Sequence, residues 1–260
     1  MFRSRPPHRA ALAAALGLAL MAGPAAAANG FDFKTMTPAQ KADFGRAVRA
    51  YLMDHPEVLV EAIDKLQSRQ AEAQAASDAT LIKANAKAIF DDPTSWVGGN
   101  PEGNVTLVEF MDYRCGYCRK AFPDIARMLK ADGRIRFIVK ELPILTPESV
   151  TGARYALAVR QVAGDAAYAK AHDALMVLNG PLNDAVLTRL SQKIGVDFDA
   201  VKPAMEGPSV SHILARNSAL ADRMQINGTP TFVLGDQLLR GYVPYAQLQD
   251  LVAQTRREDG

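Results

Sequence analysis

Two cysteines lie three positions apart, at Cys115 and Cys118, in the stretch DYRCGYCRKAF, and the 260-residue chain has no others. Such a pair can form a redox-active disulfide, supply half of a metal site, or form a structural disulfide. Structural zinc needs four ligands, and the histidines at His55, His172 and His212 are scattered and unpaired. A structural disulfide here would close a very short loop and stabilise little. The spacing therefore favours redox chemistry, with Cu(I) binding as a minor alternative.

The elements around the pair indicate which thiol reacts. The apolar run VTLVEFM at 105–111 predicts a strand just before the cysteines, and RKAFPDIARMLK predicts a helix that Gly133 ends. A cysteine between a strand and a helix lies at the helix N-terminus, where free amide N–H groups and the helix dipole stabilise a thiolate. We therefore expect Cys115 to attack and Cys118, one turn later, to resolve the mixed disulfide.

The rest of the chain predicts an α/β domain that contains a block of helices. IRFIVKEL at 135–142 is a second strand, and the order strand, helix, strand predicts a parallel βαβ unit. From about residue 146 to 225, glycines and prolines divide a helical pattern into four or five short helices. The segment 231–241 predicts a hairpin around Gly235 and Asp236, and PYAQLQDLVAQ predicts a final helix.

Residues 37–90 predict two helices of a different kind. Thr37 and Gln40 form a capping-box pattern, DHPE interrupts the first helix, and a second helix of roughly 35 residues would be about 50 Å long. Both helices carry apolar stripes, which include Val48 and Tyr51 in the first and Ile63 in the second. A stripe of this length is typical of a helix that packs on another copy of the chain, and packing on its own domain is the alternative. The turn-forming stretch DDPTSWVGGNPEGN follows as a boundary.

The N-terminus has the pattern of a secretory signal. MFRSRPPHR is basic, the apolar run after it is shorter than the about 20 residues that span a bilayer, and we place cleavage near Ala28. We therefore expect no membrane insertion after cleavage. The formal net charge is +2, without a basic stripe, which argues against a nucleic-acid partner.

Three segments carry a resemblance to a known family. VEFMDYRCGYCRKAFPDI resembles the active-site segment of the DsbA-like thioredoxin-fold thiol–disulfide oxidoreductases, and INGTPTFVLGDQLLRGY resembles their cis-proline loop and final hairpin. VRAYLMDHPEVLVEAIDKLQSRQ is similar to the leader of the ScsC-like (suppressor of copper sensitivity) subgroup. The resemblance implies a thioredoxin fold with an inserted helical domain at about 146–225. It divides the chain into a signal peptide at 1–28, an N-terminal helical oligomerisation segment at 29–98 and a catalytic domain at 99–260.

The resemblance also implies which residues bind substrate. A cis peptide bond before Pro230 would turn the backbone of Thr229 toward a bound substrate strand, with Gly116 and Tyr117 as further substrate-binding residues. Taken alone, the sequence NGTP would be interpreted as an ordinary turn.

Glu109 is the third expected catalytic residue. It interrupts an apolar strand six positions before Cys115 and matches an acid that lies buried beneath the active site in this family. A buried carboxylate has a raised pKa and can take the proton of Cys118, whereas a lone glutamate in a strand is otherwise usually exposed. Lys140 and Glu141 in the next strand are its potential partners, or simply mark the end of that strand.

The direction of the reaction is inferred from weaker signals. The dipeptide Gly116–Tyr117 and the threonine before Pro230 resemble the pattern of disulfide isomerases, whereas strongly oxidising members resemble Cys-Pro-His-Cys. We expect a periplasmic, oligomeric disulfide isomerase or reductase, a dimer or trimer, that acts on secreted client proteins and is kept reduced by a membrane reductase. The expected redox group is the Cys115–Cys118 disulfide, with no cofactor and no metal. A DsbA-like dithiol oxidase and a Cu(I) metallochaperone are the alternatives.

Overall fold

The structure is a computed structural model that describes residues 33–258, so the expected signal peptide lies outside the described residues. The chain divides into two compact units between Ile63 and Asp64. The helices are α1 (Pro38–Asp54), α2 (Glu57–Phe90), α3 (Gly116–Asp132), α4 (Pro147–Ala163), α5 (Asp165–Val177), α6 (Asp184–Ile194), α7 (Phe198–Met205), α8 (Pro208–Arg223) and α9 (Tyr245–Glu258). The strands are β1 (Trp96–Gly99), β2 (Val105–Met111), β3 (Ile135–Glu141), β4 (Thr231–Leu234) and β5 (Gln237–Arg240).

The first unit consists mainly of α1 and the first turns of α2. The Gln40 amide donates to Thr37 Oγ1 at 3.3 Å and the Thr37 amide donates to Gln40 Oε1 at 2.8 Å, which confirms the predicted capping box. No residue of α1 is buried, and Tyr51 and Met53 are exposed by 56% and 66%. The apolar stripes predicted from the sequence are therefore largely open to solvent in the single chain.

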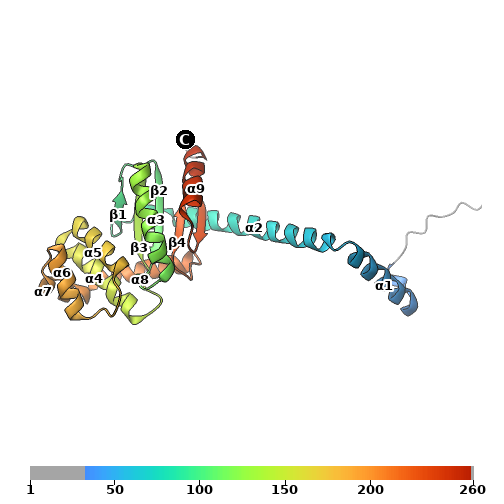
Figure 1. Ribbon diagram of the computed structural model, residues 1–260, viewed down its shortest axis with the longest axis horizontal. Coiled ribbons are helices and arrows are strands. Elements are labelled where there is room, and N and C mark those ends of the chain that lie inside the picture. The colour runs from blue at the N-terminus through green and yellow to red at the C-terminus, as the bar shows by residue number, and fades with distance from the viewer. Residues whose placement is uncertain (1–32, 259–260) are drawn as a thin grey trace, which may run out of the picture. The chain divides into compact units, whose positions relative to one another are not determined.

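The second unit is built on a five-stranded sheet in the order β1-β3-β2-β4-β5. Strands β2 and β3 are parallel and are joined by α3, which confirms the predicted βαβ unit, and the other neighbouring pairs are antiparallel (Figure 1). The hairpin β4–β5 and the final helix α9 also form as predicted. Strand β1 was not predicted, because it lies in the glycine-rich stretch that was interpreted only as a boundary.

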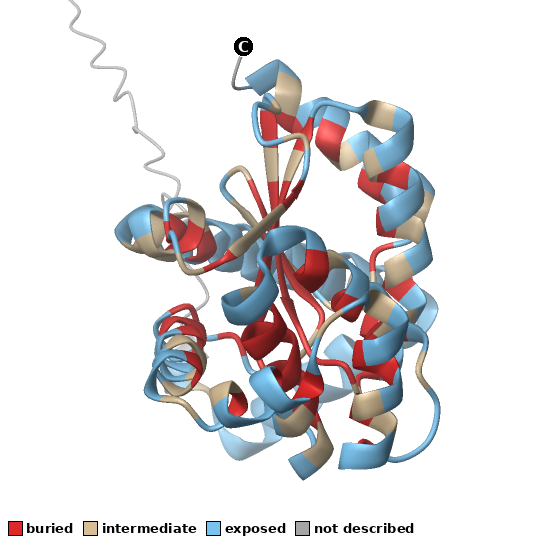
Figure 2. Ribbon diagram, turned by 90° about the vertical axis from the view of Figure 1, so that its left-hand side faces the viewer, coloured by how far each residue is buried: buried red, intermediate tan, exposed pale blue. Residues whose placement is uncertain are grey.

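Helices cover both faces of this sheet. Leu107 and Phe137 face α3 and α9, and buried residues of those helices, including Ile125 and Leu248, complete that side of the core. The opposite side of the sheet packs against α8 and the C-terminal half of α2. Figure 2 shows the buried residues along the strands and on the inner sides of the flanking helices. The sheet is thus the middle of three layers.

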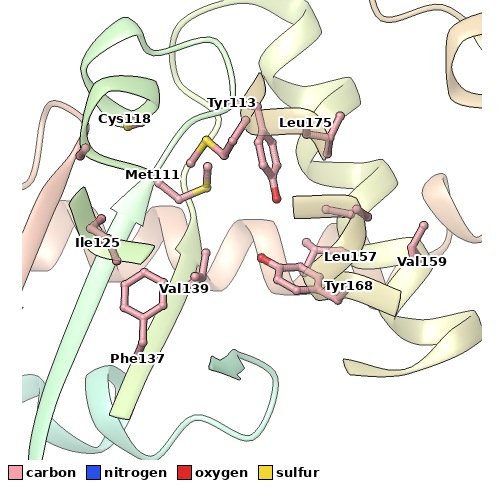
Figure 3. Packing of buried hydrophobic residues seen from close by; sticks show 14 of the residues in the cluster. Met111, Tyr113, Cys118, Ile125, Phe137, Val139, Leu157, Val159, Tyr168 and Leu175 are labelled. Atoms are coloured by element: carbon pink, nitrogen blue, oxygen red, sulfur yellow. The ribbon is translucent and has the colours of Figure 1, made fainter. Parts of the chain in front are cut away.

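Helices α4 to α8 form the inserted helical block between β3 and β4, in agreement with the predicted four or five helices. Its interior is continuous with one face of the sheet, where Met111 and Val139 lie in the same cluster as Leu157 and Tyr168 (Figure 3). This shared core holds the helical block beside the C-terminal end of β2, where the cysteine loop begins.

The C-terminal half of α2 belongs to the catalytic unit. Ile82 and Ile89 are buried beneath the sheet, and Arg240 donates to both carboxylate oxygens of Asp78 at 2.7 and 2.8 Å. The division between Ile63 and Asp64 lies within α2, which continues across it without a break. The domain boundary between residues 98 and 99 stays a prediction. Among the described residues, no helix is both long and apolar enough to cross a membrane.

Candidate active site

The two cysteines lie at the start of α3. Cys115 is the N-cap residue, and the amide of Cys118 donates to its Sγ atom at 3.4 Å. Both cysteines carry free thiols and are buried, with 5% of Cys115 exposed and none of Cys118. Between them, Gly116 is exposed and 63% of Tyr117 is exposed. The pair thus has one thiol near the surface and one beneath it.

The surroundings of Cys115 favour its thiolate. A hydrogen bond from the Cys118 side chain is the largest influence and lowers the pKa of Cys115, while burial raises it. The Thr229 side chain and the amides of Cys118 and Tyr117 lower it further, to about 5. The Thr229 hydroxyl is buried and has no hydrogen-bond partner in the described structure, so it is available to donate to the thiolate once Cys115 has lost its proton. Cys115 is therefore ionised and nucleophilic near neutral pH.

Thr229 and Pro230 lie directly opposite the first cysteine. The Thr229–Pro230 peptide bond is cis, as the resemblance implied, and in its protonated form the Cys115 thiol donates to the Thr229 carbonyl at 3.0 Å. The loop is held at both ends, because Thr231 Oγ1 donates to the Gly228 carbonyl and the Gly241 amide donates to the Pro230 carbonyl, each at 2.8 Å. The structure therefore brings together the predicted nucleophile and the predicted substrate-binding backbone.

Cys118 has the opposite character. Its hydrogen bond to Cys115 raises its pKa most, and burial and the charge of Glu109 raise it further, well above the usual range. A thiol in this state does not ionise unaided near neutral pH. Its attack on a mixed disulfide therefore needs a base nearby and relief of the charge on Cys115.

Glu109 lies in the middle of β2 and is only 1% exposed, so this glutamate is buried and not solvated. Burial raises its pKa most, and the charges of Cys115 and Glu141 add to that, to about 8. The contribution of Cys115 disappears when that thiolate enters a mixed disulfide. Glu109 then becomes more acidic and more often a carboxylate, at the stage when Cys118 must lose its proton.

Of the two potential partners of Glu109, the structure brings only one near it. Lys140 points to the opposite face of the sheet, where its ammonium group lies 3.0 Å from Asp92 Oδ2 and 2.7 Å from the Ala88 carbonyl oxygen. Glu141 shares the face of Glu109 and interacts with it electrostatically. Strand alternation separates the neighbouring side chains of Lys140 and Glu141 in this way.

Two residues that position the cysteine loop were not predicted. Asp112 accepts hydrogen bonds from the amides of Arg114, Ile144 and Leu145 at 2.7, 3.0 and 3.1 Å, and so ties the loop after β2 to the loop after β3. Arg119 in α3 donates to the carbonyls of Tyr113 and Leu178 at 2.8 and 2.6 Å. The contacts with Ile144, Leu145 and Leu178 join segments that are far apart in sequence, so no local sequence pattern predicts them.

Across residues 33–258, the histidines, cysteines and carboxylates form no group of three or more with the geometry to hold a metal ion. Cys115 and Cys118 supply two soft donors at most. The arrangement is suited to thiol–disulfide exchange: an ionised nucleophile, a buried second thiol, and a carboxyl group beneath them.

Both the catalytic unit and the N-terminal segment match known protein families. Residues 106–253 match the DSBA-like thioredoxin domain, and residues 40–73 match the copper resistance protein ScsC N-terminal domain. Among curated proteins, a Na+/H+ antiporter NhaA of Salinispora tropica is 28% identical over 155 residues. That match covers 60% of this chain and 23% of the antiporter. This chain thus spans about a quarter of that relative, and the antiporter's activity is not carried over.

Three solved structures are similar over most of their length. A thioredoxin-like oxidoreductase from Silicibacter pomeroyi is 41% identical, with a TM-score of 0.62 over 66% of this chain and 97% of that chain. A linker-deletion mutant of Proteus mirabilis ScsC is 25% identical, with a TM-score of 0.65 over 87% and 100% of the two chains. A periplasmic thioredoxin-like protein from Salmonella enterica is 28% identical, with a TM-score of 0.60 over 66% and 95%.

Proposed function

The chain belongs to the family of DSBA-like thioredoxin domains and is a thiol–disulfide oxidoreductase, and on this premise we propose that it is a periplasmic, oligomeric disulfide isomerase or reductase. The observation that carries the chemistry is the contrast between two neighbouring thiols. The pKa of Cys115 is lowered to about 5, and that of Cys118 is raised above its usual range. Cys115 attacks a client disulfide as the thiolate, and Cys118 resolves the mixed disulfide only when Glu109 accepts its proton.

The isomerase assignment is supported by the N-terminal unit. An isomerase must hold a misfolded client through several exchanges, and copies of the chain arranged around a shared cleft can do so. Residues 40–73 match the ScsC N-terminal domain, and this segment carries exposed apolar residues such as Tyr51, Leu59 and Ile63. Burying these side chains between copies would remove apolar surface from water. The high pKa of Cys118 supports the same assignment, because slow resolution prolongs the mixed disulfide.

A dithiol oxidase is the second candidate, and one observation favours it. A thiolate as stable as that of Cys115 favours the reduced enzyme, so the oxidised enzyme gives up its disulfide readily. In that case a membrane partner would reoxidise the chain, whereas the isomerase requires a membrane reductase. The periplasmic location is supported in both cases by the signal-like N-terminus and by the periplasmic relative from Salmonella enterica.

The deciding experiment compares two substrates with the same mature, full-length protein. We expect reduced protein to reactivate scrambled ribonuclease, and oxidised protein to reoxidise reduced ribonuclease much more slowly. Fast oxidation with no reactivation would support the oxidase instead. A Cu(I) titration of the reduced protein tests the metallochaperone alternative, and tight stoichiometric binding without disulfide exchange in either assay would favour it.

The assembly is tested separately by light scattering on the same preparation. We expect a dimer or trimer, and we propose that its clients are secreted proteins with non-native disulfides. A monomeric full-length protein would remove the shared cleft and leave the oxidase as the better assignment.

A further inference from the structure

Glu141 is a second buried carboxyl group beside the active site. It is the last residue of β3 and is 1% exposed. In the parallel pairing of β2 with β3, Glu109 lies opposite Val139 and Met111 lies opposite Glu141. Residues two positions apart in a strand share a face, so the two glutamates point to the same side of the sheet, one diagonal step apart. The exchange chemistry described above uses only Glu109.

Two tyrosine hydroxyls converge on Glu141. Tyr113, in the loop after β2, donates to Glu141 Oε1 at 2.8 Å, and Tyr168, in α5, donates to the same oxygen at 2.6 Å. Both tyrosines are 1% exposed, and Figure 3 shows their hydroxyl groups turned toward each other. Burial raises the pKa of Glu141 to about 8, and the two hydroxyl donors act against this rise. They do so because hydrogen bonds to an ionised acceptor are stronger than those to a neutral one.

His172 extends the chain of donors. Its Nδ1 atom lies 3.2 Å from the Tyr113 hydroxyl oxygen, and burial lowers the pKa of His172 to about 4, so the ring is neutral. The single proton of the Tyr113 hydroxyl is already donated to Glu141. The ring must therefore donate from Nδ1 to Tyr113, which polarises that hydroxyl further toward the carboxylate.

Glu109 has no comparable hydrogen-bond donors. Its Oε1 atom is buried without a hydrogen-bond partner among the described residues, and the same holds for Oε2 of Glu141. Two nearby buried carboxyl groups do not both ionise readily at neutral pH, and the charge resides on the one that the donors stabilise. Glu141 is therefore the group of the pair that ionises first as the pH rises, and its charge then raises the pKa of Glu109.

We propose that Glu141 is a positioning residue: its carboxylate, fixed by two tyrosine hydroxyls, keeps a proton on Glu109 while the Cys115 thiolate is free. This inference rests on the thiol–disulfide exchange proposed above. The other groups that face the two carboxyls are Asp112 from the loop after β2, Asp173 from α5, and the two cysteines at α3. From α8, the side-chain amide of Asn217 donates to the main-chain carbonyl of Glu141 at 3.1 Å.

The protons then balance through the exchange. Cys115 Sγ attacks a client disulfide, one S–S bond forms as another breaks, and the client thiolate leaves with the negative charge. Glu109 releases its proton to solvent once the repulsion from Cys115 has ended. Cys118 next gives its proton to the Glu109 carboxylate while its sulfur attacks Cys115 Sγ, and the second client thiolate leaves. Throughout, the charge on Glu141 raises the proton affinity of Glu109 and so slows the resolving step.

The test is the pH dependence of that resolving step in the Glu141→Gln variant. Glutamine keeps an oxygen for the tyrosine hydroxyls and removes the charge. Reduced full-length protein is mixed with oxidised glutathione, and the decay of the glutathione mixed disulfide is followed by acid quench and mass spectrometry. We expect the acid limb of the pH–rate profile to move down by about one pH unit, so that resolution below the limb is about tenfold faster.

Matched variants separate this role from a structural one. Tyr168→Phe removes one donor to Glu141 and should move the limb in the same direction by less. Tyr155→Phe removes an equally buried hydroxyl, bonded to Ser191 at 2.8 Å, and should leave the limb in place. Adding Glu141→Gln to Glu109→Gln should change nothing further, because Glu141 acts through Glu109.

A second readout does not depend on activity. Infrared difference spectra of the reduced protein should show a band from the protonated carboxyl group of Glu109, and Glu109→Gln should lack this band. As the pH rises, the band should disappear at a lower pH in Glu141→Gln than in the unmodified chain. If the acid limb of the pH–rate profile and the infrared band of Glu109 both stay in place in folded Glu141→Gln, the proposal is wrong. If Glu141→Gln does not fold, the same two measurements on Tyr168→Phe decide. If glutathione forms no mixed disulfide with the unmodified chain, the proposed function fails, and the infrared titration still judges the role of Glu141.

Discussion

The Sγ atom of Cys115 lies 3.0 Å from the carbonyl oxygen of Thr229, although the two residues are 114 positions apart in the chain. Strand pairing produces this contact. The cysteine loop follows the end of β2, the Thr229 loop precedes β4, and Phe110 pairs with Thr231 where these strands lie antiparallel. The nucleophile and the backbone expected to bind the substrate are thus held by the same two strands.

The side chain of Thr229 also lowers the pKa of Cys115, which predicts the effect of removing its hydroxyl. Thr229→Val should raise the pKa of Cys115 by about one unit, because a hydrogen bond to an ionised sulfur contributes on the order of 1.5 kcal/mol. The ultraviolet absorbance of the thiolate, measured against pH, reports this shift. Thr229→Ser keeps a hydroxyl and is the matched control. An unchanged titration in Thr229→Val would show that the hydroxyl does not stabilise the thiolate.

The roles of the two cysteines are separable by trapping. Cys118→Ser should accumulate mixed disulfides with client proteins, because the nucleophile remains and nothing resolves its product. Cys115→Ser should form none and should lose exchange at every pH. Non-reducing electrophoresis of each variant after incubation with scrambled ribonuclease distinguishes them. Trapping by Cys115→Ser alone would reverse the assignment.

The role of Glu109 is tested by the pH dependence of resolution. The pKa of Glu109 is about 8 while Cys115 is a thiolate, and it falls when that charge is lost in the mixed disulfide. The rate of resolution should therefore rise with pH through a value below about 8 and then level off. Glu109→Gln should abolish this limb and slow the step by on the order of a hundredfold. Glu102→Gln, at an exposed turn, is the control, and a limb that persists in Glu109→Gln would assign the base to another group.

Much of this site follows from the sequence, and the remainder has a physical explanation. The helix N-terminus at Cys115 was predictable because a strand, two cysteines and a helix are consecutive. The environment of Glu141 was not, because strand alternation indicates which face a side chain shares and not what packs on it. Tyr168 and His172 come from an inserted helix whose docking is decided by tertiary packing. Strand β1 was missed because pairing with β3 outweighs the poor strand propensity of its glycines.

The ion pair of Lys140 and Asp92 should make a measurable contribution to stability. Burial is the largest single influence on Asp92 and raises its pKa, but hydrogen bonds from Thr94 and Lys140 together outweigh it and lower the pKa from 3.8 to about 2. The stabilisation is therefore present above pH 3.8 and is lost as the pH falls through about 2. Asp92→Asn leaves the ammonium of Lys140 buried without its carboxylate and should cost about 3–5 kcal/mol at neutral pH.

Urea unfolding against pH measures this cost, and the variant should show a weaker loss of stability between pH 3.8 and about 2. Asp184→Asn, at an exposed pair with Lys202, should have little effect and serves as the control. Equal losses in the two variants would mean that burial does not strengthen the Lys140–Asp92 interaction.

The position of the unit boundary decides where the N-terminal segment can be removed. Deleting residues 29–63 from the mature protein takes away the exposed apolar residues of α1 and the first turns of α2, and leaves the buried half of α2 in place. We expect the product to be folded and monomeric, to exchange disulfides with glutathione through Cys115 and Cys118, and to lose most isomerase activity. One catalytic unit offers too little surface to hold a client through several exchanges.

Deleting residues 29–91 should behave differently. It removes Ile82 and Ile89, each worth about 1.5–3 kcal/mol of burial, and the Ala88 carbonyl that accepts from Lys140. The face of the sheet that these side chains cover would be exposed, so cooperative unfolding should be weakened or lost. Light scattering, urea unfolding and the scrambled-ribonuclease assay on both products measure these outcomes. A folded oligomer without residues 29–63 would place the contacts between copies in the catalytic unit. Undiminished isomerase activity in a monomer would show that client holding needs no second copy.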